Sequence, residues 1–205
     1  MPDPTRQAVI FDLGGVLIDW DPRHLYRRLF NGDDAAMEHF LANVCTPDWN
    51  RQQDGGRTFA EAEAEAAARH PDKLAFIRAW ASNFHEMIPG PIAGTVEILS
   101  ELRARGVPLY ALTNWSAETF APQPARFDFL GWLDGIVVSG QEKLMKPDPR
   151  IFRLLLDRHG IEPDRAVFID DVRANVDAAS ALGLHGILFT TPDELRRELS
   201  DLALL

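Results

Sequence analysis

Two apolar segments that end in carboxylates constrain the fold of this chain more than any other feature. Residues 9–11 are apolar and lead directly into Asp12, and residues 166–169 lead in the same way into Asp170 and Asp171. A short apolar run that is bounded by turn residues predicts a buried strand. Open α/β sheets bind ligands at the carboxyl ends of their strands. Both segments therefore place acids where a ligand is expected.

Strands and helices are predicted to alternate through most of the chain, which is typical of a doubly wound domain. Helix boundaries are marked by Asp148 before Pro149 and by Gly106 and Gly160. We expect further strands at about 107–113, 136–138 and 186–189, and helices at about 95–105, 149–159, 172–182 and from 192 onward. Right-handed crossovers then bring all strand ends to one edge. The predicted fold class is α/β, a Rossmann-like doubly wound parallel sheet.

A helical segment is inserted after the first strand. Helical patterns begin after Pro22 and are predicted at about 23–30, 58–70 and 71–87. Thr58 with Glu61, and Thr191 with Glu194, match the capping box that opens a helix. We divide the chain into a core of residues 1–18 and 89–205 and a small α-helical cap of residues 19–88.

Three more polar residues follow or flank the predicted core strands. Thr113 and Asn114 end the second core strand, and Lys146 stands alone before a helix start. Taken alone, each of these residues has an ordinary interpretation. Thr113-Asn114 is typical of a turn, Lys146 is typical of a solvated charge, and Asp12 is typical of a turn residue at the end of a strand. In a parallel sheet, however, they meet the acidic pair in one crevice, which suits a hard cation and a phosphate.

With these residues in this order, the chain resembles the haloacid dehalogenase superfamily of hydrolases, in the subgroup with a helical cap between the first two motifs. The resemblance covers essentially all 205 residues. It implies that Asp12 is the nucleophile and Thr113 the hydroxyl of the second motif. It also implies that Lys146 bridges the phosphate and the Asp12 carboxylate, and that Asp170-Asp171 is the acidic fourth motif. The Asp-Leu-Gly first motif is similar to that of sugar-phosphate phosphatases.

The resemblance implies a Mg²⁺-dependent phosphatase that acts on a small phosphorylated metabolite such as a sugar phosphate. A carboxylate can attack phosphorus to form an aspartyl phosphate, which water then hydrolyses. Mg²⁺ prefers hard oxygen ligands and keeps several waters. The expected ligands are Asp12, the backbone carbonyl of Gly14 and Asp171, with Asp170 acting through water. The alternative for the acidic pair is a helix N-cap.

Gly14 departs from the family pattern, in which a second Asp stands two residues after the nucleophile and serves as general acid and base. Such assistance is worth roughly 10²–10⁴-fold in rate. Asp19 and Asp21 are candidate replacements because they lie on the segment that enters the cap, although both also suit a turn. The turn at Gly14-Gly15 is expected to need glycine dihedrals.

Cap residues are expected to choose the substrate. The aromatic and donor side chains that we single out are Trp20, Trp49, Arg51, Gln52 and Arg57. Two Trp with nearby donors can face a sugar ring, and the alternative for each Trp is burial in the packing of the cap. On the helix after the acidic pair, Asn175 either orients Asp171 or lies at the surface.

The composition of the chain limits the classes of binding partner and the cellular compartment that we expect. The formal net charge is −10 and no Lys/Arg run is present, which argues against nucleic acid. Cys45 is the only cysteine, so no intrachain disulfide forms and a reducing compartment fits. Residues 1–6 lack the features of a signal peptide, and no stretch is long enough to span a membrane. We expect a cytoplasmic protein, monomeric or homodimeric, with a small-molecule substrate.

Two other functions stay open. A metal-independent 2-haloacid dehalogenase would use Asp12 to displace halide from carbon, and Gly14 permits it. The Asp170-Asp171 pair argues against it, because uncompensated acids would oppose the carboxylate of the substrate. The second alternative is a catalytically weak binding protein on the same fold, in which Gly14 marks lost activity.

Overall fold

Five parallel strands form the central sheet of the protein, in the order β5-β4-β1-β6-β7. The computed structural model describes residues 8–205, so the prediction about a signal peptide at residues 1–6 lies outside the described residues. The strands are β1 (Ala8–Phe11), β4 (Leu109–Thr113), β5 (Gly135–Val138), β6 (Ala166–Asp170) and β7 (His185–Leu188). The α/β fold class with a parallel core sheet is confirmed.

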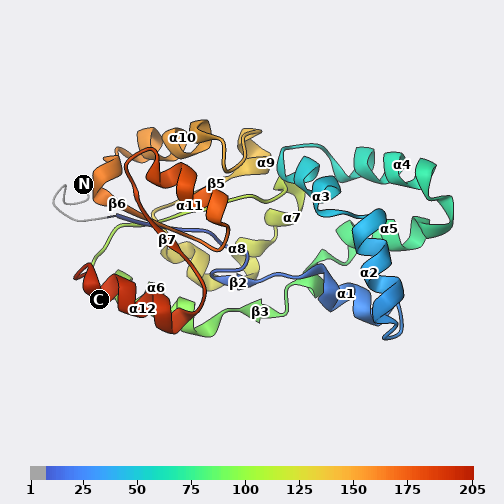
Figure 1. The fold of residues 1–205 in the computed structure, drawn as a ribbon, viewed down its shortest axis with the longest axis horizontal. Coiled ribbons are helices and arrows are strands. Elements are labelled where there is room, and N and C mark those ends of the chain that lie inside the picture. Colours follow the sequence, from blue (N-terminus) through green and yellow to red (C-terminus); the bar gives the residue numbers. More distant parts are fainter. Residues whose placement is uncertain (1–7) are drawn as a thin grey trace.

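Helices cover both faces of this sheet (Figure 1). One face packs against α10 (Pro149–His159) and α11 (Arg173–Ser180), and the other against α6 (Ala93–Ala104) and α12 (Pro192–Asp201). Alternate residues of each strand divide between two buried clusters. Ile10 and Phe168 join the α10 cluster, whereas Val9 and Phe11 join the cluster that contains residues of α6 and α12. Strands buried on both faces explain the unbroken apolar runs in the sequence.

Helix ends follow the predicted signals with one exception. Asp148 accepts a hydrogen bond from the Arg150 amide at the start of α10. The capping box of α4 (Phe59–Arg69) is formed in both directions between Thr58 and Glu61. At α12 only half of the predicted box is present, because the Glu194 carboxylate accepts from the Thr190 hydroxyl instead.

Five helices form a layer beyond the carboxyl ends of the strands, at the right of Figure 1. They are α1 (Pro22–Leu29), α2 (Asp34–Asn43), α3 (Pro47–Asp54), α4 and α5 (Leu74–Ser82). Aromatic rings hold this layer together, and they belong to Tyr26, Phe30, Phe40, Phe76 and Trp80. The single helix expected over 71–87 is wrong: it is interrupted at Asn83, a poor residue for a helix interior, and 3₁₀ turns occupy 71–73 and 84–87.

The chain leaves and re-enters the core at one place. The short strands β2 (Ile18–Asp19) and β3 (Gly90–Pro91) pair in antiparallel fashion, so the two connections to the helical layer run side by side. The division into a core and a cap at 18/19 and 88/89 stays a prediction. The remaining helices are α7 (Ala117–Phe120), α8 (Gln123–Arg126) and α9 (Ser139–Glu142). Across residues 8–205, the helices are too short or too polar to cross a membrane.

Candidate functional site

Asp12 follows β1 at the carboxyl edge of the sheet, between β4 and β6. Its amide donates to the carbonyl of Ile169 at 2.8 Å, which extends the strand pairing by one residue. Its carboxylate oxygen Oδ1 accepts from the Leu13 amide at 2.7 Å, and the residue is buried. A carboxylate held in this way has one fixed direction, as a nucleophile requires.

Lys146 is fully buried and lies between two of the predicted acids. Its Nζ is 3.0 Å from Asp12 Oδ1 and 2.7 Å from Asp170 Oδ2. The Asn114 side chain accepts from the Lys146 amide and donates to the Lys146 carbonyl, both at 2.9 Å. The Asn114 side chain therefore positions the lysine. The predicted phosphate contact at Thr113-Asn114, through the Thr113 hydroxyl and the backbone amide that follows, stays a prediction.

The two acids after β6 differ in their surroundings. Asp170 is buried and accepts from Lys146, from the Val172 amide at 2.8 Å and from Asn175 Nδ2 at 3.0 and 3.1 Å. Asn175 is buried and orients Asp170, so its predicted contact with Asp171 and its surface alternative are both wrong. Asp171 is exposed at the edge of the site. It is the better placed of the pair to contact a metal directly.

The donor set fits a hard cation. Oxygen atoms of Asp12, Asp170 and Asp171 lie within 4.8 Å of one another. Burial raises the pKa of Asp12 to about 7, Lys146 opposes the shift, and the charges of Asp170 and Asp171 add to it. Burial alone would lower the pKa of Lys146, but Asp12 and Asp170 outweigh it and raise that pKa. One ammonium thus faces three carboxylates, and a divalent cation would offset the excess negative charge.

The raised pKa of Asp12 predicts a pH dependence of stability in EDTA. Between pH 3.8 and about 7 the folded protein keeps a proton on Asp12 that the unfolded chain releases. The stabilisation is complete below pH 3.8 and lost as the pH rises through 7. The free energy of unfolding, relative to Asp12→Asn, should therefore fall with rising pH, by at most about 1.4 kcal/mol per pH unit. Urea unfolding of both proteins across this range measures the slope, and a flat difference would contradict the raised pKa.

The two glycines after Asp12 have different requirements. Gly15 has φ +76°, so any other residue would strain the backbone there, and a Cβ would also lie 2.4 Å from Asp171 Oδ2, which would have to move. Gly14 has no positive φ, and the nearest atom to a Cβ there is Trp20 Cβ at 4.0 Å. The expectation that the turn needs glycine is therefore met at Gly15 and wrong at Gly14, which has space for a side chain.

A cavity of about 320 Å³ opens above the carboxyl edge of the sheet. From the core it collects predicted residues, namely Asp12, Gly14, Thr113, Asn114, Lys146 and Asp171. The helical layer contributes Trp20, which was predicted, together with Asn50 and Asp54, which were not. We call this space the phosphate cavity, because it holds the ammonium of Lys146 beside the carboxylate of Asp12.

A second cavity, of about 650 Å³, lies between α1, α2 and α3. Trp20, Asn50 and Asp54 line both cavities, so the two meet at these residues. Arg51 lines the second cavity and is absent from the lining of the first. Most of its other walls are apolar, from Pro22, Leu41, Ala42, Cys45, Pro47 and Trp80. We call this space the cap cavity.

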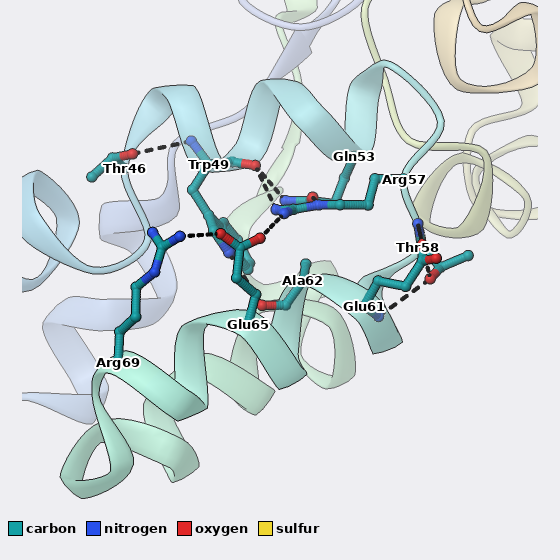
Figure 2. Close-up of polar contacts among 9 residues, drawn as sticks. All are labelled: Thr46, Trp49, Gln53, Arg57, Thr58, Glu61, Ala62, Glu65 and Arg69. Carbon is teal, nitrogen blue, oxygen red and sulfur yellow. Dashed lines mark hydrogen bonds and ion pairs between the residues drawn. The ribbon is translucent and has the colours of Figure 1, made fainter.

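Three predicted cap residues lie outside both cavities, and Figure 2 shows two of them, Trp49 and Arg57. Trp49 is buried, its Nε1 is 3.4 Å from the Ala62 carbonyl, and its ring packs edge-on against Trp80. Arg57 donates to Gln53 and pairs with Glu65 within the same layer. Gln52 lines a separate shallow cavity with Glu65. The packing of the helical layer occupies Trp49 and Arg57, and Gln52 is exposed at a separate cavity, so none of the three lines either cavity beside Asp12 and Asp54.

Asp19 and Asp21 are also engaged away from the cavities. Asp19 Oδ1 is 3.3 Å from His24 Nε2, and its side chain is half exposed. Asp21 caps α1 by accepting from the Arg23 amide at 2.8 Å. Neither residue lines the phosphate cavity. The residues of this cavity that the sequence analysis missed in the helical layer are Asn50 and Asp54, both on α3, a helix that it did not predict.

Comparisons with known proteins indicate one family for this chain. A family model of haloacid dehalogenase-like hydrolases matches residues 7–183. A sesquiterpene phosphatase of Aspergillus oryzae is 28% identical over 91% of this chain and 91% of its own length. A phosphorylated carbohydrates phosphatase of Thermotoga maritima is 26% identical over 88% of this chain and 83% of its own. Acyl-CoA dehydrogenase family member 10 of Mus musculus is 28% identical over 97% of this chain, which spans 19% of that protein.

A solved structure shows the same fold. It is a haloacid dehalogenase family enzyme of Bacteroides thetaiotaomicron in complex with magnesium and inorganic phosphate. It superposes with a TM-score of 0.68 at 24% identity and covers 91% of this chain and 95% of that chain.

Proposed function

The chain belongs to the haloacid dehalogenase-like hydrolases, and we propose that within this family it is a Mg²⁺-dependent phosphatase of small phosphorylated metabolites that uses Asp12 as nucleophile. One observation carries the proposal: the ammonium of Lys146 lies 3.0 Å from the Asp12 carboxylate at the wall of a cavity that Asp171 also lines. The phosphatases among its relatives support the same reaction class.

The reaction follows from what these residues can do. A phosphate in the phosphate cavity lies beside Lys146, which neutralises part of its charge and favours the ionised form of Asp12 that attacks phosphorus. Attack forms an aspartyl phosphate on Asp12, and water hydrolyses it. Asp170 holds the ammonium in place, and the buried Thr113 hydroxyl offers a further hydrogen bond to phosphate oxygens.

Asp12, the Gly14 carbonyl and Asp171 would hold Mg²⁺, with Asp170 behind them. When bound, Mg²⁺ supplies the positive charge that lets a dianionic phosphate approach three carboxylates. The same three carboxylates disfavour the dehalogenase reaction. A 2-haloacid carries a negatively charged carboxylate, which they would repel, and it has no phosphate that a metal ion in the site could bind.

The alcohol part of the substrate is proposed to enter the cap cavity, which joins the phosphate cavity at Trp20, Asn50 and Asp54. Because its walls are mostly apolar, we expect a phosphate ester of a bulky alcohol with apolar surface to be a better substrate than a sugar phosphate. Arg51, on the same wall, can bind a polar group at the far end of such an alcohol.

A substrate screen with and without Mg²⁺ tests this function. We expect release of inorganic phosphate from some members of a set of sugar, aryl and isoprenyl phosphates, its loss in EDTA and its return with added Mg²⁺. Parallel assays with 2-haloacids provide the control. Halide release that persists in EDTA, with no phosphate released from any ester, would establish the dehalogenase instead.

A further inference from the structure

We propose that Asp54, at the C-terminal end of the cap helix α3, is the general acid and base of this reaction and takes the role that Gly14 leaves open. The inference rests on the proposed phosphatase function. It names a residue that contacts the leaving oxygen and the attacking water, and it assigns this residue to the cap rather than to the loop after β1.

The position of Asp54 at the junction of the two cavities is the first reason. A phosphate beside Lys146 occupies the phosphate cavity, and the alcohol that it esterifies occupies the cap cavity. The bond between phosphorus and the bridging oxygen must then cross the junction. Asp54 is the only carboxylate that lines both cavities among the described residues. A proton donor for the departing alkoxide is required at this place.

The second reason is that the core holds Asp54 in position. Its carboxylate accepts a hydrogen bond from Asn50 Nδ2 at 3.1 Å. Its own carbonyl accepts from the Ser139 hydroxyl at 2.6 Å, and that hydroxyl also accepts from the Trp115 amide. The end of α3 is therefore docked on the loops that follow β4 and β5, which fixes the carboxylate relative to Asp12.

The third reason is the protonation of this carboxylate. Burial raises the pKa of Asp54 to about 7. The Ser116 amide and the charge of Arg51 on the same helix oppose the shift, and the charge of Asp12 from the core adds to it. The protonated and the ionised form of Asp54 are then both present near neutral pH. A group that gives a proton in one step and takes one in the next requires both forms.

Asp19 and Asp21, the other candidate acids, do not meet these conditions. The side chains of Asp19 and Asp21 are 48% and 38% exposed and have partners in His24 and Arg23. They were the candidates from sequence, and neither faces the junction.

The two proton transfers balance. As an oxygen of Asp12 attacks phosphorus, the bond between phosphorus and the bridging oxygen breaks. Its electron pair goes to that oxygen, which takes the proton from the Asp54 carboxyl and leaves as the alcohol. In the second step water attacks phosphorus and gives a proton to the Asp54 carboxylate. The bond to Asp12 breaks, and inorganic phosphate, the Asp12 carboxylate and protonated Asp54 result.

Asp54→Asn tests the proposal through its dependence on the leaving group. The value of kcat/KM reports the steps up to release of the alcohol, and an alkyl oxygen needs a proton there far more than an aryl oxygen does. We expect kcat/KM to fall roughly 10²–10⁴-fold for an alkyl phosphate and less than about tenfold for 4-nitrophenyl phosphate. With the aryl ester, the aspartyl phosphate should accumulate, visible as a burst of 4-nitrophenol, because its hydrolysis also needs Asp54.

Two further variants complete the test. Asp19→Asn makes the same isosteric change at an exposed carboxylate and should leave both kcat/KM values unchanged. Asp54→Glu keeps the charge but displaces the carboxyl, and it should show the same selective loss of kcat/KM for the alkyl phosphate. This variant replaces Asp54→Asn in the test if thermal melting shows that Asp54→Asn does not fold. Equal losses for both ester classes in a folded variant would overturn the role of Asp54 while the phosphatase function stands. Absence of phosphate release by the parent would overturn the function itself.

Gly14→Asp provides an independent readout, because the structure has space for this side chain. If Asp54 already supplies the proton, a second acid beside Asp12 adds only negative charge. The ratio of alkyl to aryl kcat/KM should then stay unchanged or fall in the variant. A rise in this ratio would show that a general acid is missing from the parent, and it would overturn the proposal.

Discussion

Asp12→Asn should abolish turnover and leave the fold intact. Asparagine keeps the shape of the side chain and the acceptor that binds the Leu13 amide, but it removes the anion that attacks phosphorus. Loss of a covalent nucleophile costs roughly 10⁴- to 10⁶-fold in turnover number. Steady-state phosphate release and trapping of the phosphorylated enzyme in acid are the measurements, and the variant should form no aspartyl phosphate.

Asp19→Asn is again the matched control, because it makes the same change at a carboxylate outside both cavities. Circular dichroism of both variants should match that of the parent. Residual activity of Asp12→Asn within about tenfold of the parent, a barrier change near 1.4 kcal/mol, would show that Asp12 is not the nucleophile.

Lys146→Met should reduce both stability and turnover. Methionine fills a similar volume, but Asp12 and the buried Asp170 then lose the ammonium that lies 3.0 and 2.7 Å from them. Removal of one partner from a buried ion pair costs about 3–5 kcal/mol, because the remaining charge is left uncompensated. We expect a loss of this size in urea unfolding near pH 7, together with loss of phosphate release in the presence of Mg²⁺.

Lys143→Met is the control for this variant, since Lys143 is exposed on the same connection. Its effect should stay within about 0.5 kcal/mol. The loss in Lys146→Met should also shrink when the pH is lowered, because protonation of Asp12 removes the charge that the lysine balances. Unchanged stability of Lys146→Met at all pH values would mean that the three-residue network of Asp12, Lys146 and Asp170 does not contribute to folding.

Local sequence patterns predicted the core of this protein because the core depends on local periodicity. Apolar runs that end in Asp12 and in Asp170 became β1 and β6, which are neighbours in the sheet. The second core strand, which ends in Thr113, became β4 on the other side of β1. Parallel strands bring their carboxyl ends to one edge whatever the loops do, so these residues met as expected.

The cap was predicted less well because a side chain in it can either pack or bind, and sequence does not separate the two. Trp49 and Arg57 have the types expected of substrate contacts, but the approach of α4 to α3 uses them within the layer. Asn175 was expected near Asp171 or at the surface. It binds Asp170 instead, because a buried ion pair needs its remaining hydrogen-bond groups satisfied.

The sequence by itself determined the parallel α/β core and the acids, hydroxyl and lysine at its carboxyl edge, since each depends on a strand and the residue that ends it. Only the tertiary structure decided that Gly15 and not Gly14 needs to be glycine, because only the folded backbone shows that Gly15 has φ +76° and that Gly14 has no positive φ. Only the tertiary structure brought Asp54 to the phosphate cavity. Its position depends on the docking of α3 onto the segments after β4 and β5 through Ser139, a contact that no local pattern encodes.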